Sequence, residues 1–157
     1  MKRLFSKIVF ISVVHLFYAN AAFAEILITN LDSIEVSTSA ILARDLVVTE
    51  RICIASNPVT TYALTAVGSG ENGQFSIQNG PFNMAFTLSY RDRRSGPGFR
   101  DLTSGIALSG FLTRPLGNNQ NCRGNAGRLR ITISKEALNS AVAGSYRGSL
   151  SLVVSPE

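Results

Sequence analysis

The part of the sequence that most constrains the fold is its last regular stretch, "YRGSLSLVV", at residues 146–154. Apolar residues occupy alternate positions and small or polar residues lie between them. This period of two is typical of a half-buried β-strand with one face on a core. Because only three residues follow, we expect no later strand of this sequence to pair with it, so one edge needs a neighbour from elsewhere. The inward-facing residues would be Tyr146, Leu150, Leu152 and Val154.

Similar stretches recur at short intervals, separated by turn-forming residues such as Asn79-Gly80. Short strands at regular spacing are typical of an antiparallel sandwich or barrel. Only residues 134–142 favour a helix, with Ser134 as its cap. We therefore predict an all-β chain with one short helical turn. The other expected strands are 25–29, 33–37, 46–56, 61–67, 74–78, 82–90, 104–113 and 127–134.

The N-terminus has the three parts of a secretory signal peptide. Three basic residues lie within the first seven positions, residues 8–17 are mostly apolar, and "AFA" at 22–24 supplies the small residues before a cleavage site. The apolar run is shorter than the roughly 20 residues that span a bilayer. We therefore predict cleavage after Ala24 and a mature chain that does not stay inserted in the membrane.

Loss of the signal peptide changes the composition that bears on function. The net charge of the full sequence is +5, and the mature chain would keep 12 basic against 10 acidic residues, about +2. The only histidine, His15, also leaves. Without it there is no Ser-His-Asp or Cys-His catalysis and no histidine metal site. We expect no catalytic residue, no metal, no cofactor and no nucleic-acid partner.

Cys53 and Cys122 are the two cysteines of the sequence. In an exported chain a distant pair of cysteines most often forms a disulfide. Closing a loop of about 70 residues would stabilise the fold by roughly 4 kcal/mol in a chain-entropy treatment. A catalytic or metal-binding thiol would need partner residues that the chain lacks, so we predict a structural disulfide.

"GSGENG", from Gly68 to Gly73, has the glycine spacing of the dinucleotide-binding motif. In that motif a helix follows the glycines and its N-terminus holds the pyrophosphate. Here a strand is expected to follow, and Glu71 would repel phosphate. We interpret the segment as a strand connection.

The loop "RDRRSGPGFRD" at 91–101 concentrates positive charge around one aromatic ring. It would bind an acidic surface, a polysaccharide or another subunit, or it is a solvated loop whose arginines are partly neutralised by Asp92 and Asp101. These two carboxylates would also suit glycoside hydrolysis, but neighbouring arginines favour an ion pair over a general acid. The candidate ligand residues are Arg91, Arg93, Arg94, Phe99 and Arg100.

The order of these features resembles a known family. The strand that contains Cys53 is followed by "YALTAVGSGENGQFSIQNG" and "FTLSYRD", then by "NCRGNAGRLRITIS", a short "KEALNSAVAGSY" connection and the terminal "YRGSLSLVVSPE". Over residues 46–157 the chain is similar to pilin-like subunits of the bacterial chaperone–usher pathway, in particular to spore coat protein U domains. The paired cysteines and the terminal strand carry most of the likeness.

The resemblance implies an immunoglobulin-like β-sandwich that lacks its last strand. In such subunits a periplasmic chaperone lends a strand to the open groove, and the N-terminal extension of the next subunit replaces it in the fibre. Basic chaperone residues would anchor the terminal carboxylate. Carried onto this sequence, the groove and chaperone contacts are Tyr146, Leu150, Leu152, Val154 and Glu157.

The segment at 25–45 is the candidate donor. Its alternation slips at "TNLDS", and the chain ends in "VVSPE", where many pilins have an aromatic residue. Two arrangements therefore stay open: "EILIT" is donated and "SIEVS" is the subunit's first strand, or the whole segment completes its own sandwich. The candidate donor residues are Ile26, Ile28, Leu31, Ile34 and Val36.

We therefore expect a structural subunit of a surface fibre, exported to the periplasm and then to the cell surface, and not an enzyme. Its expected partners are a periplasmic chaperone, an outer-membrane usher and neighbouring pilin subunits. The alternative is a tip adhesin or a stand-alone periplasmic β-sandwich that binds a ligand. The chain would divide into a signal peptide (1–24), an N-terminal extension (25–45) and a sandwich domain (46–157).

Overall fold

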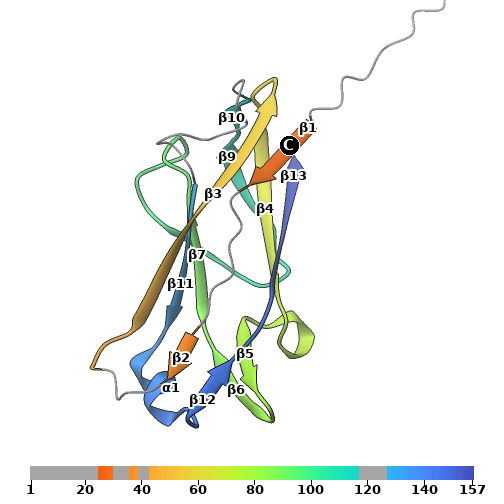
Figure 1. Ribbon diagram of the computed structural model, residues 1–157. Helices are drawn as coiled ribbons and strands as arrows, with labels where there is room; N and C mark the ends of the chain where they lie inside the picture. Colours follow the sequence, from red (N-terminus) through yellow and green to blue (C-terminus); the bar gives the residue numbers. More distant parts are fainter. Residues whose placement is uncertain (1–24, 30–35, 39–42, 117–126) are drawn as a thin grey trace, which may run out of the picture.

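The computed structural model describes residues 25–29, 36–38, 43–116 and 127–157, and the side chains of 43–116 and 127–157. The predicted signal peptide lies outside them. The described residues form an all-β, sandwich-like fold with one short α-helix and one 3-10 turn (Figure 1). The predicted all-β class is therefore confirmed.

The first sheet is built around three antiparallel strands, β3, β11 and β7. β3 pairs with β11 along seven residues and β11 pairs with β7, so residues far apart in the sequence share one surface. Two short strands extend the sheet at its edges, and another runs parallel to β3. The strands in spatial order are β1 (Glu25–Thr29), β3 (Leu46–Asn57), β11 (Gly127–Ile133), β7 (Thr87–Arg91) and β8 (Arg100–Leu102), with β10 (Arg114–Pro115) on β3.

The second sheet has β4 at its centre, between β13 and β9. A 3-10 turn at Glu71–Gly73 leads from β4 into a hairpin, and the predicted Asn79-Gly80 turn joins the two strands of that hairpin, with Gly80 at φ +58°. The bounds are β13 (Leu150–Pro156), β4 (Thr61–Gly68) and β9 (Leu108–Leu112) for the sheet, β5 (Ser76–Asn79) and β6 (Phe82–Ala85) for the hairpin, and β2 (Val36–Thr38) with β12 (Gly144–Tyr146) for a separate pair.

The expected single strand at 82–90 is wrong in one respect, because it divides at Phe86. There the N–H of Phe86 donates to the carbonyl of Phe75 at 2.9 Å, and the chain passes from the hairpin to the first sheet. Met84 on β6 and Leu88 on β7 are both buried, whereas Phe82 is 47% exposed. The buried residues therefore still alternate along 82–90, but the two halves of this segment belong to different sheets.

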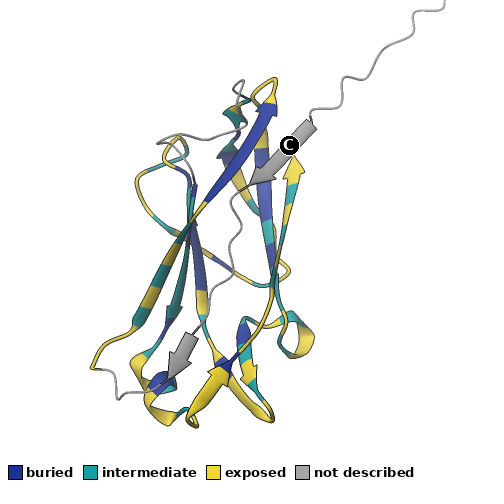
Figure 2. Ribbon diagram, in the orientation of Figure 1, coloured by how far each residue is buried: buried dark blue, intermediate teal, exposed yellow. Residues whose placement is uncertain are grey.

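The buried apolar residues form two clusters between these layers. Figure 2 shows buried residues along β7, β4 and part of β3. The main cluster contains Ile52, Ile54, Tyr62, Leu64, Ala66, Leu88, Tyr90, Leu102, Phe111 and Leu129. The second cluster, at the end of the molecule near β12, contains Met84, Ile133, Leu138 and Tyr146.

The expected helical turn is confirmed as α1, Lys135–Ser140. The hydroxyl of Ser134 accepts a hydrogen bond from the N–H of Ala137 at 3.2 Å, as an N-cap does. Leu138, 6% exposed, faces the second cluster. The cap and one buried leucine fix this short helix against the hairpin.

Candidate functional site

β13 is an edge strand of the second sheet. Leu150 to Pro156 pair with β4, and no strand among the described residues pairs with the other edge of β13. Leu150, Leu152 and Val154 pack against the main cluster but are only half-buried, as the teal positions of β13 in Figure 2 show. This partial burial is what a strand covered along one edge only would have.

The first half of β3 shows the same pattern. β1 covers one edge of β3 only at residues 53–57, and β11 covers the opposite edge at 46–52. Ile54, which lies opposite Ile28 of β1, is 3% exposed, and Ile52 just before it is also fully buried. Val48, which precedes them on the same face, is only half-buried. Within the described residues, this edge of β3 therefore lacks a partner where β1 ends.

We call these two unpaired edges, β13 and residues 46–52 of β3, the open side of the sandwich. They belong to the front strands of the two sheets in Figure 1. Glu50 lies on the inner face here, because its register partner Leu129 is a core residue and opposite residues share a face. Glu50 is half-buried, and its side-chain carboxylate makes no hydrogen bond or ion pair with the described residues. The open side thus combines apolar side chains with one carboxylate.

Tyr146, which the resemblance grouped with the leucines of β13, lies away from the open side. Its ring is 3% exposed and its phenol donates to the carbonyl of Val142 at 3.1 Å. β2 pairs with β12 and places Val36 opposite Tyr146, while Gln78 of β5 exchanges two hydrogen bonds with Arg147. With neighbours on both sides, this part of the chain buries its inward side chain completely.

Glu157, a predicted chaperone contact, is bonded within the chain. Its N–H donates to the carbonyl of Thr61 at 3.0 Å, and its own carbonyl accepts from the Thr61 hydroxyl. Its side-chain carboxylate accepts from the N–H of Gly110 at 3.2 Å. These bonds hold the end of β13 against β4 and β9.

The candidate donor segment is also paired within the chain. In β1, Ile26 lies opposite Ser56 and Ile28 opposite Ile54. Val36 lies on β2, opposite β12. Leu31 and Ile34 lie outside the described residues. "EILIT" and the end of "SIEVS" are therefore both strands of this chain.

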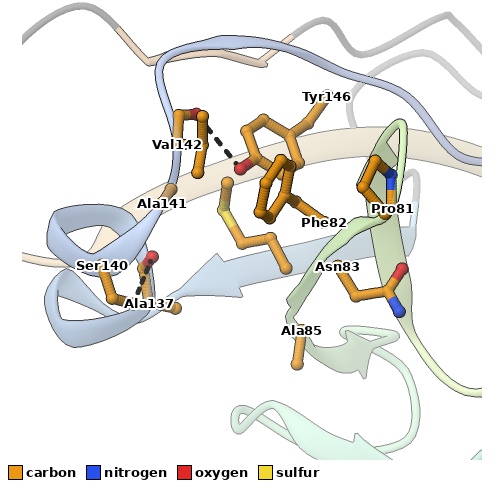
Figure 3. A pocket seen from close by; sticks show the side chains of 10 residues that line it. Pro81, Phe82, Asn83, Ala85, Ala137, Ser140, Ala141, Val142 and Tyr146 are labelled. Carbon is orange, nitrogen blue, oxygen red and sulfur yellow. Dashed lines mark hydrogen bonds between the residues drawn. The ribbon is translucent and has the colours of Figure 1, made fainter.

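A small pocket of about 250 Å³ lies between the β5–β6 hairpin and α1 (Figure 3). Phe82, Met84 and Val142 contribute much of its apolar lining, and Tyr146 closes one side. Phe82 and Val142 are 47% and 44% exposed. Asn83 and Ser140 add polar groups, and among the described residues no charged side chain lines the pocket.

Elsewhere, buried polar groups join the two sheets. The phenols of Tyr62 on β4 and Tyr90 on β7 share a hydrogen bond of 2.8 Å, and Phe111 packs against both rings. Burial raises the pKa of Tyr90 to about 12 and raises the pKa of Tyr62 still further. Both phenols are therefore neutral in the folded protein at ordinary pH.

Asp92 adds an ion pair to this region. It is 3% exposed and accepts hydrogen bonds from the Arg114 guanidinium, the Arg94 N–H and the Ser95 hydroxyl. Asp101, by contrast, is exposed on β8. The arrangement favours a structural role for Asp92. We call Tyr62, Tyr90, Asp92 and Arg114 the polar link.

The arginines of the 91–101 loop do not form one cluster. Arg94 donates to the carbonyl of Thr113 at 3.0 Å, and the Arg100 guanidinium lies 4.7 Å from the centre of the Phe111 ring. Arg93 is exposed. Among the candidate ligand residues, the Arg91 guanidinium lies over the Phe99 ring, 4.9 Å from its centre.

Cys53 is 2% exposed on β3 and is disulfide-bonded. Its predicted partner, Cys122, lies outside the described residues. A bond at this position would tie the end of β3 to the connection that precedes β11.

Sequence reasoning missed the contribution of β3 to the open side. The run "LVVTERI" places Leu46, Val48, Glu50 and Ile52 on one face by simple alternation, so the inward row was readable. The lack of a neighbouring strand along residues 46–52 could not be predicted, because it depends on where the pairing of β1 with β3 stops.

Comparison with known proteins adds no relative: no protein-family model matches the chain, and no curated protein matches it significantly. In the described part of the chain, no helix has the length and apolar character needed to cross a membrane. The same residues contain no group of three or more His, Cys, Asp or Glu side chains placed to hold a metal. The open side is the candidate site that the geometry supports best.

Proposed function

We propose that the chain is a structural subunit of a chaperone–usher surface fibre, assembled by donor-strand exchange. The observation that supports this most is the half-buried row Leu150, Leu152 and Val154 on an edge without a partner among the described residues. An incoming strand would bond to the main chain of β13 and cover this row. Main-chain bonds supply affinity in such pairing, and alternate side chains supply specificity.

The register of β2 supports a donor from another polypeptide. Val36 lies opposite Tyr146 in an antiparallel pair. An unbroken extension of that pairing would set Asp32 and Asn30 opposite the two leucines of β13. Because opposite residues share a face, two polar side chains would then face the core. A strand from a second chain can choose its register freely and present apolar side chains instead.

In this proposal the donor is the segment that pairs with β3 in the isolated chain. Its transfer exchanges five residue pairs with β3 for pairing with β13 of a neighbouring subunit. A periplasmic chaperone would cover the open side first, and an outer-membrane usher would direct the exchange. Covering this edge before assembly matters, because exposed strand edges lead to aggregation.

The alternative is a stand-alone periplasmic binding module or a tip adhesin. The pairing of β1 with β3 and of β2 with β12 supports it, because the candidate donor is then used within its own chain. Such a protein would be a stable monomer and would gain nothing from a further strand.

A peptide-addition experiment separates the two functions. Residues 25–157, with the disulfide formed, are mixed with the peptide "EILITNLDSIEVS", and the melting temperature and mass are measured. A fibre subunit should form a 1:1 complex with a higher melting temperature. A peptide with Ile26 and Ile28 replaced by Asp should have no effect. A monomer whose melting temperature ignores both peptides would contradict donor-strand exchange and support the alternative.

A further inference from the structure

The outer face of the first sheet carries a row of arginines that comes from three different strands. Arg51 of β3 lies opposite Arg128 of β11, and Arg128 lies opposite Arg91 of β7. Opposite residues share a face and their Cβ atoms lie about 5 Å apart. The adjacent residues Ile52 and Leu129 point into the main cluster, so the arginines point outward. The row crosses two strand spacings, about 10 Å.

Arg130 widens this row. Its Nε donates to the Ser89 hydroxyl at 3.1 Å, and its guanidinium lies 4.0 Å from the centre of the Phe99 ring. Arg91 approaches the same ring at 4.9 Å. The cations over Phe99 therefore fasten the 91–101 loop to the sheet. We call Arg51, Arg91, Arg128, Arg130 and Phe99 the arginine face.

None of these four guanidiniums has an ion pair with a described carboxylate within 4.0 Å. The acidic residue that the register brings nearest is Asp101, which lies opposite Ser89 and is exposed. Like charges placed directly opposite each other in a sheet are destabilising. The arginine face therefore concentrates positive charge, and binding of an anionic ligand would reduce the repulsion between its arginines.

We propose that the arginine face binds an acidic polysaccharide, that is, a glycan chain that carries carboxylate or sulfate groups. Planar guanidinium groups bond such anions through two parallel hydrogen bonds. A flat strand surface also suits an extended polymer better than a compact ligand. On the same outer face, Thr49 lies opposite Arg130 and Thr87 lies opposite Thr132, and their hydroxyls can bond to sugar hydroxyls.

Two other polyanionic partners fit the face less well. Single-stranded nucleic acid gains much of its affinity from bases stacked on open aromatic rings, but the Phe99 ring is already occupied by two guanidiniums. An anionic membrane needs apolar side chains that insert beside the cations. The exposed large apolar residue described on this face is Val47, at 54%. A glycan requires neither feature.

This proposal does not depend on strand exchange. The arginine face lies on the outside of the first sheet, and β13 belongs to the second sheet. An added strand on β13 would leave Arg51 and Arg128 accessible. The face would serve a fibre subunit and a stand-alone module equally.

Titration calorimetry of residues 25–157 with heparin tests the proposal, with neutral dextran as the uncharged polymer. Arg128→Gln removes the centre of the row and should weaken heparin binding about tenfold. Arg147→Gln makes the same change of charge at an exposed site beyond the first sheet, and should weaken it less than twofold. Raising the salt concentration should reduce heparin affinity less steeply for Arg128→Gln than for the unmodified chain, because fewer charges are neutralised.

Folding and ligand class need their own controls. Thermal melts should show that Arg128→Gln is as stable as the unmodified chain, and Arg51→Gln, at an exposed position, should reproduce its loss of heparin binding. Equal losses from Arg128→Gln and Arg147→Gln, or no heparin binding at all, would overturn the proposal. Tighter binding of an oligothymidylate than of heparin at equal charge would overturn the choice of a glycan.

Discussion

The polar link and the open side differ in how the two sheets meet. At the polar link, Tyr62 and Tyr90 share a buried hydrogen bond and Asp92 is paired with Arg114. At the open side, the inward side chains of β13, such as Leu152, are half-buried and one edge lacks a partner among the described residues. Burying a polar group is unfavourable unless it has a hydrogen-bond partner, and the polar link supplies such partners. We infer that the polar link stabilises the fold, whereas the open side is the part that would accept a strand in the proposed function.

The largest effect should come from breaking the ion pair of the polar link. Arg114→Ala leaves Asp92 buried without its cation, and breaking a buried pair in this way costs about 3–5 kcal/mol. Urea denaturation would measure the loss in the free energy of unfolding. Arg93→Ala removes an exposed arginine of the same loop and should change stability by less than about 0.5 kcal/mol. Equal effects of the two substitutions would mean that the ion pair of Asp92 with Arg114 does not stabilise the fold.

The loss of stability caused by a substitution at the open side should depend on whether the donor peptide is bound. Leu152→Ala should cost about 1–2 kcal/mol in the isolated chain, because the side chain is only half-buried, and about 2–4 kcal/mol once a bound strand covers it. Denaturation with and without "EILITNLDSIEVS" measures the difference. Val153→Ala, on the outer face and 52% exposed, should have a small effect in both states. If the peptide does not change the stability lost in Leu152→Ala, the peptide does not bind over Leu152.

High pH should lower the free energy of unfolding through the buried tyrosines of the polar link. Burial raises the pKa of Tyr90 from about 10 in the unfolded chain to about 12. The raised pKa stabilises the fold fully below pH 10, and this contribution is lost as the pH rises from 10 to 12, by about 2–3 kcal/mol. Denaturation at pH 9, 11 and 12 would follow the loss. Tyr90→Phe should reduce this pH dependence by about half, because Tyr62 keeps its own raised pKa; an unchanged slope would assign it to other groups.

Much of the fold could be predicted because its signals are local. The strand expected at 46–56 lies at 46–57, and the one expected at 61–67 lies at 61–68. Alternation and turn residues are enough for such assignments. The division of 82–90 at Phe86 is different, because both halves keep the same alternation. The first half pairs with β5 in a local hairpin, but the second half joins the first sheet through β11, which is far away in the sequence.

The candidate site could be predicted only in part, for the same reason. The alternation of the last strand located Leu150, Leu152 and Val154, but it also included Tyr146. Tyr146 is separated from them by its neighbours β2 and β5, which the pattern of its own strand does not contain. The arginine face needs three strands in register and so had no signature in any single stretch.

The smallest effect on stability should come from substituting Glu50, the one carboxylate on the inner face of the open side. It is half-buried in the isolated chain, so Glu50→Leu should change stability by less than about 1 kcal/mol. A donor strand that covers this part of β3 would remove water from the carboxylate, which is unfavourable without a cation. Glu50→Leu should therefore raise the affinity for the donor peptide about tenfold, and Glu50→Gln should raise it less. A peptide with a lysine facing Glu50 should bind the unmodified chain more tightly but not the leucine variant. Unchanged affinity in both variants would mean that the bound strand leaves Glu50 in water, which would restrict strand addition to the edge of β13 and remove β3 from the open side.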